Sequence, residues 1–266
     1  MEDLKITLIQ TKLHWENPKE NRTHFGRLLG EIPDDSDLIL LPEMFTTGFT
    51  MNPEKYAEPF SQNMPTLEFL RKFAKSKDAV ISGSVSTEDS AKYYNRLFWV
   101  RPDGSFSFYD KRHLFTFAEE DKHYSGGDKK IIEEIKGWKI LPLTCYDLRF
   151  PVWSRNRLVD GKPEYDLLTY VANWPAARSA PWSQLLPARA NENQAYVAGL
   201  NRVGKDGNGI DHSGDSIVIS PKGETISAAK PNEEQIFSAV LSREDLERFR
   251  EKFPVLHDGD DFSLNI

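Results

Sequence analysis

The sequence predicts an α/β protein built from two β-sheets with helices on their outer sides. Segments with the apolar pattern of strands alternate with segments of helical periodicity in both halves of the chain. Hydrophobic residues make up 39% of the 266 positions, which is enough for a sizeable core, and no linker composition divides them. We therefore expect one domain over residues 1–266, ending in a C-terminal tail from about residue 254.

The first half of the chain predicts strands separated by two helices. Apolar or alternating runs predict strands at residues 4–10, 37–41, 79–85, 94–100 and 105–111. Apolar residues at helical spacing predict one helix around Phe25 to Ile32 and another over residues 65–77. Pro102-Asp103-Gly104 has the composition of a turn, so it is expected to join two of these strands directly.

The second half of the chain also predicts both strands and helices. Strands are expected at residues 131–135, 138–145, 165–172, 197–203, 216–220 and 234–241. Residues 182–196 predict a helix that Pro187 should kink or restart, because proline lacks the backbone N–H and clashes with the preceding turn. Pro221-Lys222-Gly223 is expected to form a hairpin turn, and Ser242 to cap a last helix that ends near Phe253.

Three of the predicted strands end on a reactive side chain. Glu43 follows the apolar run 37–41, Lys111 closes the strand 105–111, and Cys145 ends the strand 138–145. Cys145 is the only cysteine, and a lone cysteine is more often inert core than nucleophile. In α/β proteins, however, reacting groups gather where loops leave the ends of strands, so the three together favour a catalytic interpretation.

The segments around these residues resemble a known family. LPEMF at 41–45, YDKRHLF at 109–115 and CYDLRFP at 145–151 are similar to the Glu-Lys-Cys blocks of the nitrilase, or carbon–nitrogen hydrolase, superfamily. VANWP at 171–175 and NRVG at 201–204 resemble its omega-amidase branch more closely. The resemblance implies a four-layer α-β-β-α sandwich and an amidase that needs no cofactor.

The chemistry of amide hydrolysis gives each residue of the triad a role. Cys145 would attack the amide carbon and form a thioester, which requires a partner that takes the thiol proton or stabilises its charge. Glu43 is the candidate base for both halves of the reaction. Lys111 would favour the thiolate and stabilise the tetrahedral oxyanion together with the backbone N–H of Tyr146.

The resemblance also implies a second carboxylate that contacts the lysine. Glu119, Glu120 and Asp121 are consecutive, so the sequence leaves the assignment open between the two glutamates. Position in the motif favours Glu120, and a cationic lysine needs a charge partner. The alternative for either residue is an exposed loop acid.

The substrate class rests on the resemblance. It implies hydrolysis of the terminal amide of 2-oxo acid amides such as 2-oxoglutaramate and 2-oxosuccinamate. Alternatives are an amidase for deaminated glutathione, an N-carbamoyl amino acid amidohydrolase, a nitrile-hydrolysing enzyme and a non-catalytic binding scaffold. The scaffold would be expected to have lost part of the triad, which this chain retains.

Arg149 is the candidate for recognising a substrate carboxylate. It lies four residues after Cys145, and a guanidinium can donate two parallel hydrogen bonds to a carboxylate. Trp174 and Tyr146 would form the walls of the same pocket. The competing interpretation is that Arg149 makes a structural ion pair beside Pro151.

Charge and composition restrict the partners to small molecules. The net charge of -7 argues against binding to a nucleic-acid backbone. The six histidines show no metal-binding spacing, and no nucleotide-binding loop is present, so neither a metal nor a cofactor is expected. The N-terminus predicts neither a signal peptide nor a membrane span, and a single cysteine fits the reducing cytoplasm.

The resemblance further implies a homodimer. Residues 152–158 and the alternating Phe262, Leu264 and Ile266 of the tail offer apolar groups that a monomer would leave exposed. The alternative is that the tail packs on its own subunit.

Overall fold

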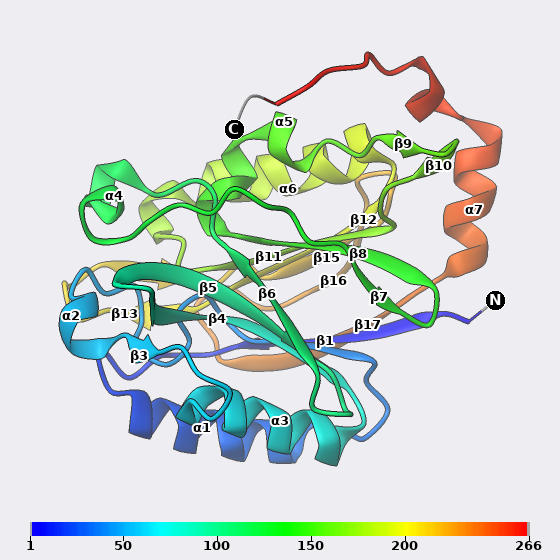
Figure 1. The fold of residues 1–266 in the computed structure, drawn as a ribbon. Coiled ribbons are helices and arrows are strands. Elements are labelled where there is room, and N and C mark those ends of the chain that lie inside the picture. Colours follow the sequence, from blue (N-terminus) through cyan, green and yellow to red (C-terminus); the bar gives the residue numbers. More distant parts are fainter. Residues whose placement is uncertain (1, 265–266) are drawn as a thin grey trace.

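Two β-sheets lie face to face in the computed structural model, which describes residues 2–264, and helices cover both outer sides (Figure 1). This is the α-β-β-α order of layers expected for the chain. Ile266, which was expected to contribute to an apolar tail, lies outside the described residues. No helix in residues 2–264 is both long and apolar enough to span a membrane.

The first sheet comes from the N-terminal part of the chain and one late strand. Its order is β17 (Gln235–Leu241), β1 (Leu4–Gln10), β2 (Leu38–Leu40), β4 (Val80–Asp89), β5 (Lys92–Val100) and β6 (Phe106–Asp110), with β3 (Glu58–Pro59) beside β4. Strands β1, β2 and β4 are parallel, so the loops that follow them emerge at one edge.

The second sheet is built from the middle of the chain. Its order is β16 (Thr225–Ala228), β15 (Ile217–Ile219), β12 (Tyr196–Asn201), β11 (Leu167–Ala172), β8 (Trp138–Thr144) and β7 (Glu133–Ile135). Strands β8, β11 and β12 are parallel. Two short hairpins lie apart from both sheets: β9 (Leu158–Val159) with β10 (Lys162–Pro163), and β13 (Val203–Lys205) with β14 (Asp211–Ser213).

The helices form the outer layers. The long ones are α1 (Pro18–Glu31) and α3 (Pro65–Lys77) against the first sheet, α6 (Ser179–Asn193) against the second, and α7 (Arg243–Lys252) near the C-terminus (Figure 1). The short ones are α2 (Pro53–Tyr56), α4 (Glu120–His123), α5 (Pro151–Ser154), η1 (Thr116–Ala118), η2 (Cys145–Arg149), η3 (Ala176–Arg178) and η4 (Val255–Asp258). Ser242 caps α7 as expected, because its side chain accepts a hydrogen bond from the backbone N–H of Asp245.

Side-chain alternation along the strands separates two apolar cores. In β1, Ile6 and Leu8 pack with the core between the sheets, whereas Ile9 packs with the helix-facing core. The same alternation in β5 sends Trp99 inward and Phe98 towards the helices. The parallel strands β1 and β2 therefore bury both faces, which explains the apolar runs of the sequence there, whereas the edge strand β17 alternates buried and exposed residues.

Pro187 was expected to kink or restart its helix, and the restart does not occur. Helix α6 runs without interruption from Ser179 to Asn193 with Pro187 inside it. Proline removes one backbone hydrogen bond, but Trp182 and Leu186 of the same helix are buried in the core of the second sheet. Tertiary packing outweighs the local preference, as it commonly does in helices.

Asp147 connects the two sheets. It lies in η2, after β8 of the second sheet, and its Oδ2 accepts a 2.8 Å hydrogen bond from the hydroxyl of Tyr109 in β6 of the first sheet. The same oxygen accepts from the backbone N–H of Thr144 at 3.1 Å, and Oδ1 accepts from the backbone N–H of His113 at 3.0 Å. This carboxylate thus fixes the end of β6 relative to the end of β8.

We expect Asp147→Ala to lower the free energy of unfolding by about 3 kcal/mol, because buried donors on both sheets lose their acceptor. Urea denaturation measures the change. Asp34→Ala is the control: Asp34 is 72% exposed and pairs with Lys77 at the surface, so its loss is expected to cost less than about 1 kcal/mol. Equal effects of the two substitutions would contradict the inter-sheet role.

Candidate active site

Glu43, Lys111 and Cys145 meet at the carboxyl ends of β2, β6 and β8. The Nζ of Lys111 lies 2.9 Å from Oε1 of Glu43, and both side chains are completely buried. Cys145 follows β8 and lies close enough to this pair for the charges of Glu43 and Lys111 to act on the pKa of its thiol, which burial raises. The three strand ends identified in the sequence therefore come together in one site.

Glu120, not Glu119, contacts the lysine. Its Oε2 lies 2.8 Å from Nζ of Lys111, and its side chain is fully buried. Oε2 also accepts a 2.6 Å hydrogen bond from the backbone N–H of Phe115. Glu119 points away from the site, is 60% exposed, and pairs with Lys122. The structure thus separates two adjacent residues that the sequence left ambiguous.

Lys111 carries its charge in a dry environment. Burial favours the neutral amine, but the neighbouring carboxylates of Glu120 and Glu43 outweigh it and raise the pKa of Lys111. Burial also raises the pKa of Glu120, and Glu43 adds to this rise while Lys111 opposes it. One cation shared by two carboxylates therefore forms the centre of the site.

Asn95 of β5 joins the two carboxylates and was not identified from the sequence. Its Nδ2 donates to Oε1 of Glu43 at 2.8 Å and to Oε1 of Glu120 at 3.2 Å. Oε2 of Glu43 accepts a 2.7 Å hydrogen bond from the backbone N–H of Asn173, which follows β11. The orientation of Glu43 is therefore fixed from both sheets.

The loop that carries Glu43 lies very close to strand β4, and this contact fixes its conformation. The backbone N–H of Met44 donates to the hydroxyl of Ser84 in β4 at 2.8 Å. At Gly83 an added Cβ would lie 2.7 Å from the Cβ of Leu41, so only glycine permits the loop to lie this close to β4. Met44 itself has a positive φ of 42°, a conformation that costs free energy in a residue with a side chain.

Cys145 begins a tight turn instead of ending its strand. Strand β8 stops at Thr144, and Cys145 opens η2 with a φ of 44°. Burial raises the pKa of the Cys145 thiol, and Glu43 adds to the rise, while Lys111 opposes it. Lys111 thus acts in the expected direction, towards the thiolate, but burial and Glu43 outweigh it and favour the thiol.

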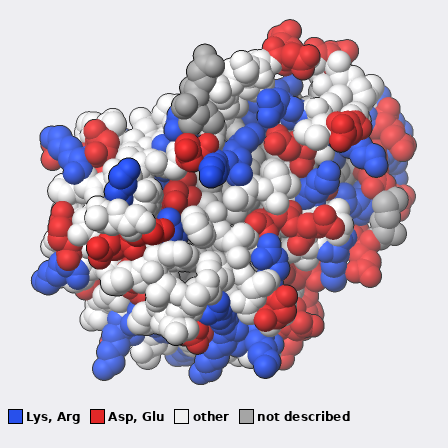
Figure 2. All heavy atoms as spheres, viewed as in Figure 1, with Lys and Arg blue, Asp and Glu red and all other residues white. Residues whose placement is uncertain are grey.

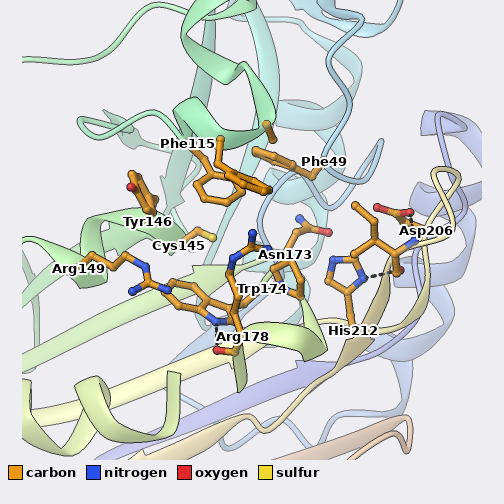
Figure 3. Close-up of a pocket in the computed structure, with 14 residues that line it drawn as sticks. Phe49, Phe115, Cys145, Tyr146, Arg149, Asn173, Trp174, Arg178, Asp206 and His212 are labelled. Carbon is orange, nitrogen blue, oxygen red and sulfur yellow. Dashed lines mark hydrogen bonds between the residues drawn. The ribbon is translucent and has the colours of Figure 1, made fainter. Parts of the chain in front are cut away.

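The thiol faces a cavity of about 230 Å³ with largely aromatic walls (Figure 3). Tyr146, Arg149 and Trp174, the three residues proposed from the sequence, all line it. The remaining lining residues are Phe49, Phe115, Phe117, Ala118, Asn173, Pro175, Arg178, Asp206, Ile210 and His212. A volume of this size suits a small molecule. Within residues 2–264, no cluster of His, Cys, Asp or Glu is arranged to hold a metal ion.

Arg149 has no ion-pair partner in the described part of the chain. Its guanidinium lies 4.9 Å from the ring centre of Trp174. The alternative interpretation, a structural ion pair beside Pro151, therefore lacks its carboxylate. On the face drawn in Figure 2, acidic and basic side chains are interspersed without one large basic field.

Comparisons with known proteins agree with this geometry. The chain matches the carbon–nitrogen hydrolase family model over residues 5–251. It is 49% identical over 264 residues to Omega-amidase YafV of Escherichia coli strain K12, covering 99% of this chain and 100% of that protein. It is 30% identical over 256 residues to 2-oxoglutaramate amidase of Bacillus subtilis strain 168, covering 95% and 96% of the two chains.

A solved structure is similar over the whole molecule. XC1258 from Xanthomonas campestris, described as a CN-hydrolase superfamily protein with an arsenic adduct in the active site, has a TM-score of 0.97 and 43% sequence identity, with 100% of both chains covered. These findings confirm the family resemblance and the four-layer fold that the sequence predicted. The chain belongs to the carbon–nitrogen hydrolase family.

Proposed function

We propose that the protein is an omega-amidase that hydrolyses the terminal amide of small 2-oxo acid amides, such as 2-oxoglutaramate and 2-oxosuccinamate, to the dicarboxylate and ammonia. The relatives named above support the reaction class. The observation that carries the proposal is a buried Glu43–Lys111–Glu120 cluster next to the Cys145 thiol. Cys145 lines a cavity that is also lined by Arg149, an arginine without a carboxylate partner in the described residues.

The first half of the reaction forms a thioester. Glu43 takes the proton of the Cys145 thiol as the sulfur attacks the amide carbon. The C=O bond opens to a tetrahedral oxyanion, and Glu43 then passes the proton to the leaving nitrogen. The C–N bond breaks and ammonia departs. Burial raises the pKa of the Cys145 thiol, so the attack requires Glu43 to remove its proton.

Lys111 stabilises the oxyanion. An ammonium group has three N–H donors, and Nζ of Lys111 donates to Oε1 of Glu43 at 2.9 Å and to Oε2 and Oε1 of Glu120 at 2.8 and 3.1 Å. In the reaction the N–H on the longer Glu120 contact turns to the oxyanion, with the backbone N–H of Tyr146 as the second donor. Glu120 holds the lysine as a cation and fixes its position.

The second half of the reaction releases the acid. Glu43 draws a proton from a water molecule that attacks the thioester carbon, and Lys111 again stabilises the oxyanion. When the C–S bond breaks, the sulfur recovers its proton from Glu43. The products are a carboxylic acid, which ionises, and the free thiol of Cys145.

Arg149 binds the carboxylate of the substrate, and Trp174 and Tyr146 enclose the carbon chain between it and Cys145. A guanidinium stacked on an aromatic ring keeps its edge donors available for an anion. The proposal also retains the homodimer and a cytoplasmic location. In support of a dimer, Val152 and Phe253 are exposed at 51% and 59%, although Trp153, from the same predicted segment, is buried in its own subunit.

The reaction is tested with a panel of amides assayed for ammonia release. We expect the highest kcat/KM on 2-oxoglutaramate or 2-oxosuccinamate, above deaminated glutathione and N-carbamoyl amino acids. Cys145→Ala should lose at least about 1000-fold in kcat, because it lacks the covalent nucleophile. Preference for another amide would overturn the substrate class, and retained turnover in Cys145→Ala would remove Cys145 from its role.

The adjacent glutamates provide a matched pair of variants. Glu120→Gln should lower kcat by about 100-fold or more, because the lysine loses an anionic partner in a buried site. Glu119→Gln alters an exposed side chain and is expected to retain wild-type activity. Steady-state kinetics and melting temperatures of both variants decide the assignment. A larger loss in Glu119→Gln than in Glu120→Gln would reverse it.

The dimer is tested by size-exclusion chromatography with light scattering. We expect a mass twice the 30.5 kDa of one chain at micromolar concentration. Val152→Glu, which adds a charge to the exposed apolar side chain, should shift the population towards monomer. A wild-type mass of one chain would refute the proposal.

A further inference from the structure

Arg149 and Arg178 differ from every other arginine in residues 2–264. The guanidinium groups of the others all donate hydrogen bonds to protein oxygens. Those of Arg149 and Arg178 donate none, and both side chains line the cavity that contains Cys145 (Figure 3). Because both side chains are partly exposed and find no acceptor in the described residues, their N–H groups are left to water or to a ligand.

The position of Arg178 is fixed without the use of its side-chain donors. Its guanidinium carbon lies 4.5 Å from the ring centre of Phe117 and 5.4 Å from that of Phe115. Its backbone carbonyl accepts a 2.6 Å hydrogen bond from Nε1 of Trp174. The aromatic walls of the cavity therefore hold both arginines, and the N–H groups of both remain available to a ligand.

Other charged groups of the cavity leave these two cations uncompensated. The lining acid Asp206 accepts hydrogen bonds from the backbone N–H groups of Asn208 and Ile210, at the end of the cavity away from Arg149 (Figure 3). His212 adds no positive charge at neutral pH, because burial lowers its pKa to about 4. The arginines therefore define a cationic end of the cavity.

We propose that Arg178 is a second anion-binding residue, which acts with Arg149 to hold the carboxylate and 2-oxo oxygen of the substrate and to reject amides that carry an ammonium group at that end. The inference rests on the proposed omega-amidase function. It assigns to the two arginines the selectivity of that function for 2-oxo acid amides over amides that carry an ammonium group. A 2-oxo acid presents acceptor oxygens to both arginines. Glutamine presents an ammonium group beside the carboxylate, and that cation is repelled by the two guanidinium groups.

Four amides of equal chain length separate the contributions of the carboxylate, the 2-oxo oxygen and the ammonium group. They are 2-oxoglutaramate, glutarate monoamide, glutamine and neutral pentanamide. The variants are Arg178→Met, Arg178→Lys and Arg149→Met, with Arg27→Met as the control. Arg27 pairs with Glu31 on the exposed side of α1, so its replacement is expected to leave all four rates unchanged.

For Arg178→Met, we expect the loss of kcat/KM on glutarate monoamide to exceed the loss on pentanamide by at least about tenfold, as for a charge-assisted hydrogen bond. The ratio of 2-oxoglutaramate to glutamine activity should also fall by at least about tenfold, because one source of repulsion is gone. Arg178→Lys should recover part of both effects. Equal losses on charged and neutral amides, or no loss on glutarate monoamide, would overturn the inference.

A binding measurement separates this inference from the proposed function. Glutarate is titrated into Cys145→Ala and into Cys145→Ala/Arg178→Met by calorimetry, so that no turnover is required. At least about tenfold weaker binding to the double variant supports the anion site even if wild-type enzyme fails to hydrolyse 2-oxoglutaramate. Equal binding to the two variants overturns the site, even if the omega-amidase activity is confirmed.

Discussion

The burial of Lys111 between two carboxylates is the constraint on which the site depends. Removing an ammonium group from water costs several kcal/mol, and only close ionic and hydrogen-bonded partners offset that cost. Glu43 lies in the loop after β2 and Glu120 begins α4, far apart in the sequence, and each lies within 3 Å of the same nitrogen. The three segments must therefore adopt their positions together, since displacement of any one leaves an unpaired buried charge.

The two sheets make this arrangement possible. Glu43, Lys111 and Asn95 belong to the first sheet and its loops, whereas Cys145 and Asn173 follow strands of the second. The apolar core between the sheets fixes the distance between these two sets of residues, and Asp147 adds a polar contact from the second sheet to the first. Cross-sheet packing thus sets the geometry of the base relative to the nucleophile.

The sequence predicted the strands well because burial on two faces leaves long apolar runs, and it predicted the three strand-end residues because their blocks are distinctive. It could not choose between Glu119 and Glu120, since Glu119 directly precedes the short helix α4 that Glu120 begins, and only tertiary contacts decide which of the two is buried. Arg178 was missed for a related reason. Nothing local marks it, and its place in the cavity depends on the η3 turn and on Phe117.

Local charge in the cavity also acts on the binding of the substrate and on the release of the product. The chain has a net charge of -7, so an anionic substrate meets long-range repulsion and needs cationic groups at the site itself. In the proposed reaction Arg149 and Arg178 attract its carboxylate end, while the amide that reaches Cys145 is neutral. Hydrolysis converts this amide into a second carboxylate beside Glu43 and Glu120. Like charges repel in a dry site, so the same carboxylates that prepare the nucleophile favour release of the product.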